Sequence, residues 1–341
     1  QDINRGVRRL RETTAQLAKE KAWYYLLERT TQSMQQSLSG WRDLIRQIGK
    51  GTGKRAPRLI REARKQMRAA QMAVPAWIMP LSRVWQNINT KNPKFDIIIV
   101  DEASQADLSA LALLYFGKRI IIVGDDQQVS PTSWEKDDEI EKFRKMYLEN
   151  KVKNAASYTA EASLYSITYM FYQRLMLKEH FRCVPEIIGY SNNLAYNNEI
   201  EPLRESGDIY QPVISYRVNG RREETRQVNV LEARQIAAFF AACLEQPEYS
   251  GKTFGAITLL GNEQAEEIRQ EVLEHIGIIK MEACNFLCGN SANFQGDERD
   301  IIFLSMVDSA TGDEKLNKLV DSKASMSKRY NVAVSRARDQ L

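Results

Sequence analysis

Cysteine is scarce in this sequence, and long apolar runs are missing. The 341 residues contain four cysteines, which are Cys183, Cys243, Cys284 and Cys288. Four are too few for a disulfide framework in a chain of this length, and Cys284 and Cys288 lack a second Cys/His pair that would complete a zinc site. No stretch approaches the ~18–20 apolar residues of a membrane span, and the first residues lack a signal-peptide core. We therefore expect a soluble, cytoplasmic protein with ordinary thiols and no membrane partner.

The composition is that of a folded protein. Hydrophobic residues make up 43% of the chain and charged residues 27%, which excludes disorder for the bulk of it. The length is enough for two domains of about 100–200 residues each. No sustained heptad repeat and no low-complexity tract is present.

The net charge of +4 hides an asymmetry between the two ends of the chain. Residues 1–73 hold 17 Lys and Arg against 6 Asp and Glu, a balance of +11, whereas the remainder carries −7. A basic block suggests an anionic partner, most simply nucleic-acid phosphate. A solvated helical face explains the charge equally well.

This basic block has a helical pattern. Residues 5–38 contain almost no Gly or Pro and carry apolar residues at three- and four-residue spacings. The glycines at 49–53 interrupt the pattern, and Pro57 starts it again through Met72. We expect two or three basic helices with a glycine hinge.

From Val74 onward, short apolar runs alternate with helical patterns. The β-branched runs at 95–100 and 118–123 are typical of buried parallel strands, and residues 104–115 between them fit one helix. A second series predicts strands at 213–216, 254–260 and 301–306, with helices at 231–244, 263–275 and 329–338. Together they indicate two α/β units with parallel sheets, divided near residues 161–177.

Two carboxylates follow the first of these strands. Ligands of parallel α/β sheets bind beyond the carboxyl ends of strands, where Asp101 and Glu102 stand. Asp101 suits Mg²⁺, which prefers oxygen ligands, and Glu102 could orient or deprotonate an attacking water. The alternative is that both acids favour a helix N-terminus. The next strand ends in Gly124-Asp125-Asp126-Gln127-Gln128, where Gln128 could bind both a γ-phosphate and that water.

These segments resemble the motifs of superfamily 1 helicases. Residues 101–105 (DEASQ) look like motif II, 124–131 like motif III, 177–187 (LKEHFRCVPEI) like motif IV, 294–300 (FQGDERD) like motif V and 330–338 (YNVAVSRAR) like motif VI. They occur in family order over residues 74–341 and are most similar to the branch that contains the nonsense-mediated-decay RNA helicase and its bacterial relatives. The resemblance implies two RecA-like domains and the cofactors ATP and Mg²⁺.

The resemblance also implies roles for single residues. Arg182 and Arg336 would reach the γ-phosphate as arginine fingers, since guanidinium groups bind phosphate oxygens in a bidentate fashion. Glu298 would accept a ribose hydroxyl, and Gln295 with Gly296 would link the nucleotide site to the nucleic-acid groove. For any single arginine, a surface ion pair is the alternative, and for Arg338 we expect a structural pair.

The phosphate-binding loop of such a motor, Gly-x-x-x-x-Gly-Lys-Ser/Thr, does not occur in the sequence. Near-matches at 48–55 and 246–253 lack the first glycine. In the family the loop lies upstream of a helical insertion, so we expect an interior piece of a larger helicase, with one half of a split helicase as the alternative; either would bind ATP poorly alone. The expected domains are a basic helical insertion at 1–73, an incomplete first RecA-like domain at 74–175 and a second at 176–341.

Nucleic-acid contacts are expected ahead of motif II and in the basic block. Ser82 and Arg83 are candidates for phosphate contacts, and Trp77 could stack on a base, although core packing is its alternative. The cations near the glycine hinge, namely Lys50, Lys54, Arg55 and Arg58, are candidates for an accessory clamp.

The leading hypothesis is an ATP-dependent helicase or translocase on single-stranded nucleic acid. Resemblance to this branch favours DNA over RNA, movement from 5′ to 3′, and a nuclease or phage-defence partner outside this chain. The rival hypothesis is a non-catalytic nucleic-acid clamp or scaffold with a degenerate motor. A nuclease within the chain is disfavoured, because no Asp…Glu-x-Lys cluster lies outside the helicase motifs.

Overall fold

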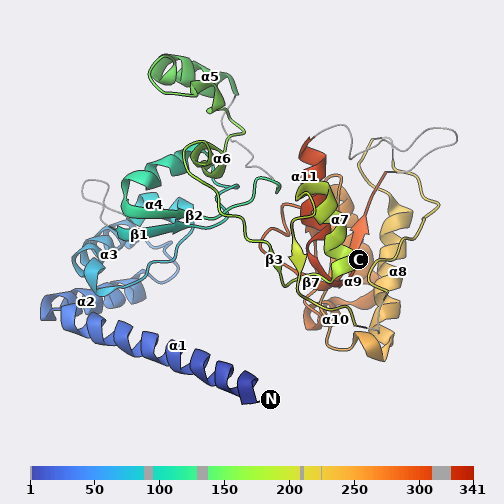
Figure 1. Ribbon diagram of the computed structural model, residues 1–341, viewed down its shortest axis with the longest axis horizontal. Helices are drawn as coiled ribbons and strands as arrows, with labels where there is room; N and C mark the ends of the chain where they lie inside the picture. Colours follow the sequence, from blue (N-terminus) through green and yellow to red (C-terminus); the bar gives the residue numbers. More distant parts are fainter. Residues whose placement is uncertain (1, 88–94, 129–136, 208–210, 224, 309–323) are drawn as a thin grey trace. The chain divides into compact units, whose positions relative to one another are not determined.

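The computed structural model describes residues 2–87, 95–128, 137–207, 211–223, 225–308 and 324–341. The chain divides into two compact units (Figure 1). The first consists of Gln1–Ile98 and Ala112–Ile120, and the second of Ile99–Leu111 and Ile121–Leu341.

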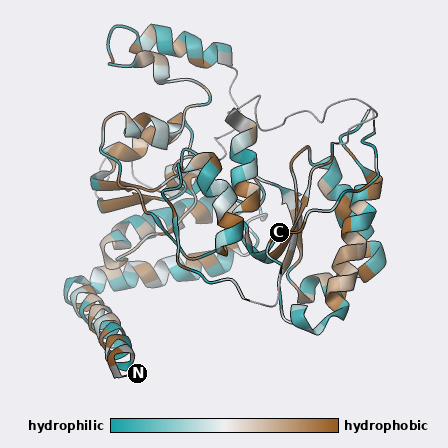
Figure 2. Cartoon of the chain, turned by 45° about the vertical axis from the view of Figure 1, so that its right-hand side comes forward, coloured by the Kyte–Doolittle hydropathy of each residue, from teal (hydrophilic) through white to brown (hydrophobic). Residues whose placement is uncertain are grey.

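The first unit begins with three helices, in agreement with the helical pattern of the basic block. They are α1 (Asp2–Arg29), α2 (Gln32–Ile48) and α3 (Ala56–Ala70). The pattern through residues 5–38 is broken at Thr30, because Thr31 caps α2 by accepting a hydrogen bond from the backbone N–H of Met34. In Figure 2, α1 carries apolar and polar residues along its length, and most of its large apolar side chains are exposed.

Helices α2 and α3 form a hairpin. Ala56, Ala63 and Ala70 are buried at seven-residue intervals along α3, so the two helices can approach closely. Gly49 and Gly51 take positive φ angles in the turn, as the glycine hinge predicts. The 3-10 turn η1 (Gln71–Ala73) and helix α4 (Leu81–Asn87) follow.

The predicted strands at 95–100 and 118–123 are β1 (Phe95–Val100) and β2 (Gly117–Ile122), which pair with each other. The N–H of Phe95 donates to Phe116 at one end and that of Val123 to Val100 at the other, so the two strands run in the same direction. The helix expected at 104–115 is wrong in type and length. A 3-10 helix, η2 (Leu108–Tyr115), forms instead, and turns occupy the residues after Val100.

Short elements then lead to the C-terminal sheet. They are α5 (Asp137–Phe143), the π-helix η3 (Arg144–Leu148), η4 (Ala155–Ser157), α6 (Leu164–Tyr169), β3 (Glu179–His180), α7 (Pro185–Ala195) and β4 (Glu201–Pro202). Strands β3 and β4 pair in parallel. The amide groups at the start of α6 donate to the carbonyls of Ala106 and Ala103, which fastens this helix to the segment that follows β1.

The C-terminal sheet has the order β6-β5-β7-β8 and is parallel throughout. Its strands and helices are α8 (Val230–Glu245), η5 (Pro247–Tyr249), β5 (Phe254–Thr258), α9 (Glu263–Ile276), α10 (Ile278–Ala283), β6 (Leu287–Asn290), β7 (Arg299–Ser305), α11 (Ala324–Val334) and β8 (Ala337–Gln340). The predictions for 231–244, 254–260, 263–275 and 301–306 are confirmed.

Helices cover both faces of this sheet. Ile257 and Ile302 pack on one face with α7 and α11, whereas Phe254, Ala256 and Ile301 pack on the other with α8 and α9. Because side chains alternate along a strand, a central strand buried on both faces is a continuous apolar run in the sequence. All of β5 is buried, and Figure 2 shows the strands of this sheet as largely hydrophobic.

Two local predictions in this region are wrong. Residues 213–216 form no assigned strand, although Ile214 donates a backbone hydrogen bond to Leu341, which in turn donates to Pro212. The helix expected to reach Arg338 ends at Val334, and β8 begins at Ala337 because its backbone joins β7. No helix among the described residues is long and apolar enough to cross a membrane.

Candidate active site

The carboxyl end of β1 presents the two acids that the sequence singles out. Asp101 and Glu102 are both exposed, and Asp101 Oδ1 accepts the N–H of Glu102 at 2.9 Å. Glu102 has φ of 50°, an uncommon conformation for a residue other than glycine, and its carboxylate accepts Nε2 of Gln105 at 3.0 Å. Residues in sparsely populated backbone conformations tend to cluster at functional sites.

The segment after β2 lies against the segment after β1. The N–H of Asp125 donates to Ser104 Oγ at 3.0 Å, and Asp125 accepts Nε2 of Gln128 at 3.0 Å. A Cβ atom at Gly124 would stand 2.7 Å from the ring of Tyr165, so any side chain here would require that ring to shift. The strand-end residues 124–128 are thereby brought beside residues 101–105. Val129, Ser130 and Pro131 of the motif III resemblance lie outside the described residues.

A partly buried polar network continues from Asp125 to Tyr196, which follows α7, and to Asn331 of α11, all within the second unit. Tyr196 donates its hydroxyl to Asp125 Oδ2 at 2.6 Å, and Asn331 Nδ2 contacts both Tyr196 Oη at 2.9 Å and the carbonyl of Gln127 at 3.0 Å. Burial, followed by the charge of Asp125, raises the pKa of Tyr196, so the hydroxyl remains a donor. Tyr196 is not among the site residues predicted from the sequence, because a single tyrosine beyond the motif IV resemblance belongs to no recognisable pattern.

Arg336 is the most deeply buried of the predicted site residues, at 2% exposure. Its guanidinium contacts neutral acceptors, namely the carbonyls of Val332 and Asp297 and, at 3.3 Å, Oε1 of Gln128. Among the residues that the structure describes, no carboxylate forms an ion pair with it. Burial, followed by the charge of Arg182, lowers the pKa of Arg336, while Glu102 opposes the shift. The site therefore holds a buried cation with unused capacity for an anion.

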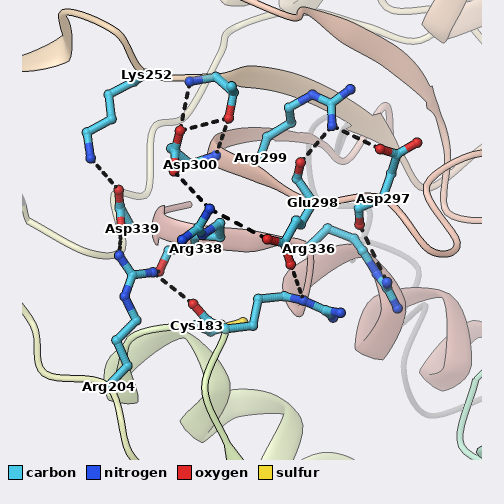
Figure 3. A network of polar contacts seen from close by, with 12 residues as sticks. Cys183, Arg204, Lys252, Asp297, Glu298, Arg299, Asp300, Arg336, Arg338 and Asp339 are labelled. Carbon is cyan, nitrogen blue, oxygen red and sulfur yellow. Dashed lines mark hydrogen bonds and ion pairs between the residues drawn. The ribbon is translucent and has the colours of Figure 1, made fainter. Parts of the chain in front are cut away.

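Arg182 is arranged differently. Its Nε donates to Glu298 Oε2 at 2.7 Å and its Nη1 contacts the carbonyl of Ser335 at 3.4 Å. Arg338 pairs with Glu298 at 3.5 Å and with Asp300 at 3.8 Å, which agrees with the structural pair expected for it (Figure 3). The acid predicted to accept a ribose hydroxyl thus holds two arginines.

Arg182, Glu298 and Arg338 lie at a shallow depression of about 390 Å³. Its lining consists of Glu179, His180, Phe181, Arg182, Glu298 and Arg338. His180 Nε2 accepts the N–H of Cys183 at 2.9 Å, and burial lowers the pKa of this histidine. Burial raises the pKa of the Cys183 thiol to about 12. Cys183 is therefore a packed, protonated thiol that contacts the carbonyl of Ser335.

The turn before β7 contains the remaining predicted nucleotide residues. Gly296 takes φ of 80°, which suits glycine, and Gln295 beside it is partly buried. Phe294, which is fully buried, anchors this turn in the core. The turn is held close to motif VI, because Arg336 reaches the carbonyl of Asp297.

The predicted nucleic-acid residues belong to the first unit. Lys50, Lys54, Arg55 and Arg58 are all exposed and gather at the turn of the α2–α3 hairpin. Ser82 and Arg83 are exposed at the start of α4. Trp77 is partly buried, and its indole N–H has no partner among the described residues.

The donor set near β1 suits magnesium. No group of three or more His, Cys, Asp or Glu within the described ranges could hold a metal by protein ligands alone. Mg²⁺ is commonly held by one or two carboxylates together with phosphate and water, and the exposed carboxylates of Asp101 and Glu102 are hard oxygen donors of that kind.

Two known protein families match most of the chain. Residues 160–341 match a family described as AAA domain, and residues 2–136 match a second family with the same description. The chain therefore belongs to the AAA domain family and has the two RecA-like domains of superfamily 1 helicases.

Relatives support the same class at low identity. The chain is 27% identical over 267 residues to an uncharacterized ATP-dependent helicase of Mycoplasma pneumoniae. This match covers 72% of this chain and 23% of that protein. It is 24% identical over 305 residues to one of Mycoplasma genitalium, covering 82% and 25%. Identity to helicase SEN1 of Saccharomyces cerevisiae is 24% over 273 residues, covering 74% and 11%. The chain thus spans a quarter or less of the length of these relatives.

Proposed function

We propose that this chain supplies the hydrolytic and coupling part of an ATP-dependent translocase or helicase that acts on single-stranded nucleic acid. The observation that carries the proposal is Arg336, a buried guanidinium on neutral acceptors, one of which is the side chain of Gln128. A buried cation without a carboxylate partner is expensive unless it serves an anionic ligand. A γ-phosphate between the motif III and motif VI segments is such a ligand.

In the proposed reaction, Asp101 binds the nucleotide's Mg²⁺ and Glu102 accepts a proton from the attacking water. Mg²⁺ supplies charge neutralisation on the phosphate oxygens when it is bound. Gln128 orients the water and the γ-phosphate, and Arg336 stabilises the charge that develops on the transferred group. Arg182 joins Arg336 once it exchanges its contact with Glu298 for phosphate oxygens. Glu298 then accepts a ribose hydroxyl, and Gln295 with Gly296 relays the nucleotide state to the nucleic-acid groove.

We further propose that nucleic-acid phosphates meet the cations of the hairpin turn and the start of α4. Four cations are exposed on one turn, and clustered cations of this kind can bind a nucleic-acid phosphate backbone; they are Lys50, Lys54, Arg55 and Arg58. Ser82 and Arg83 are the second set. We favour DNA as substrate, movement from 5′ to 3′, and a nuclease or phage-defence partner outside this chain, all three by family resemblance.

A non-catalytic clamp is the second candidate function. The 341 residues contain no Gly-x-x-x-x-Gly-Lys-Ser/Thr sequence, which favours it. The acids at 101 and 102, Gln128 and the two arginines oppose it, since a clamp needs none of them.

The experiment compares ATP hydrolysis by the 341-residue chain and by a form extended upstream through a phosphate-binding loop, hereafter the extended protein. Each is measured with and without single-stranded DNA and RNA. We expect turnover from the extended protein alone, stimulated by a single strand, and its loss in the Glu102→Gln variant. An extended protein that stays silent with both nucleic acids would favour the clamp. If the Glu102→Gln variant keeps its turnover, Glu102 is not the group that accepts a proton from the attacking water.

A further inference from the structure

Arg204 lies outside every motif of the sequence, yet it contacts two segments of the second unit that are far apart in the chain. It follows β4, whose parallel pairing with β3 brings Leu203 N–H to the carbonyl of His180 at 2.8 Å. This pairing places residue 204 next to the chain that carries Arg182. Nothing in the local sequence of residues 201–207 predicts this, because the β3–β4 contact joins residues more than twenty positions apart.

The guanidinium of Arg204 bridges two backbones. Its Nη1 donates to the carbonyl of Arg182 at 2.8 Å and to that of Arg338 at 2.9 Å, and its Nη2 pairs with the carboxylate of Asp339. The Asp339 side chain is only 7% exposed and is held a second time by Lys252 Nζ at 2.8 Å. Figure 3 shows Arg204 and Lys252 on either side of Asp339. Since β8 pairs with β7, the bridge is anchored in the core sheet.

Both bridged backbones carry proposed phosphate-binding arginines. Arg182 itself is one, and Arg336 precedes the bridged carbonyl of Arg338 by two residues. The same two segments are also in direct contact. Val184 N–H donates to the carbonyl of Arg338 at 3.0 Å, and the carbonyl of Ser335 contacts Arg182 Nη1 at 3.4 Å and the Cys183 thiol at 3.3 Å. We propose that Arg204 is a positioning residue that fixes the spacing between the segments of Arg182 and Arg336, so that both guanidinium groups can meet one phosphate. This inference rests on the proposed function and names a residue that the motifs do not contain.

The chemistry requires arginine at this position. One planar guanidinium supplies two donors to the carbonyls and a third to the carboxylate in fixed directions, whereas a lysine ammonium is a point charge on a flexible stem. Arg204→Lys should therefore keep the pair with Asp339 and lose part of the bridge. Arg204→Met should lose both. Arg217→Met is the matched control, since Arg217 is exposed and belongs to no described contact of this network.

The first test is hydrogen exchange in the 341-residue chain. We expect the Val184 amide to exchange about 10-fold faster in Arg204→Met, while the amides of β5 keep their protection, because only the local contact opens. Arg217→Met should match the parent chain. Unchanged exchange at Val184 in Arg204→Met would overturn the proposal. If Arg204→Met fails to fold, Arg204→Lys gives the same comparison with the charge retained.

The second test is catalytic and uses the extended protein. We expect kcat for ATP to fall about 10²-fold in Arg204→Met with a much smaller change in KM, because misplacement acts on the transition state. Binding of ADP with aluminium fluoride should weaken more than binding of ADP, and Arg204→Lys should be intermediate. A merely structural residue would change stability without this selectivity.

Arg336→Met, assayed in parallel, separates the two proposals. If Arg336→Met abolishes turnover while Arg204→Met leaves kcat unchanged, the positioning role is wrong and the proposed function stands. If Arg336→Met keeps full turnover, the proposed function is wrong, and the positioning role is refuted with it.

Discussion

Replacing Arg336 by methionine should separate catalysis from stability. The side chain is 2% exposed and its three contacts to neutral acceptors are long, between 3.3 and 3.5 Å. Each such hydrogen bond contributes about 1 kcal/mol or less to stability, and removing the guanidinium also removes the cost of keeping an ion out of water. Methionine fills most of the volume left by the stem. We therefore expect the free energy of unfolding to change by less than about 2 kcal/mol.

The catalytic effect should be much larger. An arginine that stabilises the transferred phosphoryl group contributes roughly 10³-fold or more to kcat, which corresponds to about 4 kcal/mol of transition-state stabilisation. Arg336→Lys should recover only part of this, since an ammonium cannot bind two phosphate oxygens in a fork. Arg217→Met, which changes an exposed arginine, should behave as the parent in both assays.

The assays are urea denaturation of the 341-residue chain and steady-state ATP hydrolysis by the extended protein. Three results would refute the reasoning. One is an Arg336→Met chain that loses several kcal/mol of stability, which would make Arg336 a structural residue. Another is full turnover in Arg336→Met, which would remove it from the reaction. The third is complete rescue by lysine, which would show that charge alone matters.

Further predictions concern packing and titration in the second unit. Gly255→Ala should destabilise the chain by about 1–3 kcal/mol in urea denaturation, because the added Cβ would stand 2.8 Å from Ile302 Cδ1; a stability equal to the parent would mean that the sheet yields at no cost. Burial raises the pKa of Cys183 and of Cys288 to about 12 each, so iodoacetamide at pH 8 should modify these thiols about 10³-fold more slowly than a free thiol. Peptide mass spectrometry measures this, with the urea-unfolded chain as the control; alkylation of the folded chain at the unfolded rate would contradict it. Burial also raises the pKa of Glu232, although its carboxylate accepts two backbone N–H groups. The native state then binds this proton more tightly than the unfolded state, so this contribution to stability is greatest at low pH and declines as the pH rises through the raised pKa. The difference in unfolding free energy between the parent and Glu232→Gln should follow that decline, and a pH-independent difference would refute the assignment.

The sequence predicted the elements whose pattern is local. The strands at 95–100 and 254–258 and the helices at 230–245 and 263–276 follow from apolar runs and three- to four-residue spacings, which depend only on residues close in the chain. The local pattern gave the wrong secondary structure where pairing with a strand distant in the chain determines it. The predicted helix at 329–338 ends early, and residues 337 and 338 belong instead to β8, because β7 offers hydrogen bonds to that strand.

The same distinction holds for the candidate site. Motif order pointed to Asp101, Gln128 and Arg336, and the structure places Gln128 against Arg336, although they are 208 positions apart in the chain. The motifs did not point to Tyr196, whose hydroxyl group forms hydrogen bonds with both Asp125 and Asn331.

What the sequence determined by itself is the class of this protein, because each motif is a short run of residue types whose chemistry can be recognised without knowing its neighbours. Only the tertiary structure decided which of the two arginines is already paired with a carboxylate and which remains able to bind an anionic ligand. Arg182 and Arg336 look alike in the sequence, but Glu298 holds the first at 2.7 Å, while the second is buried on neutral acceptors. The physical reason is that desolvation and ion pairing depend on groups brought together from remote parts of the chain, and these decide what a charged side chain has left to bind.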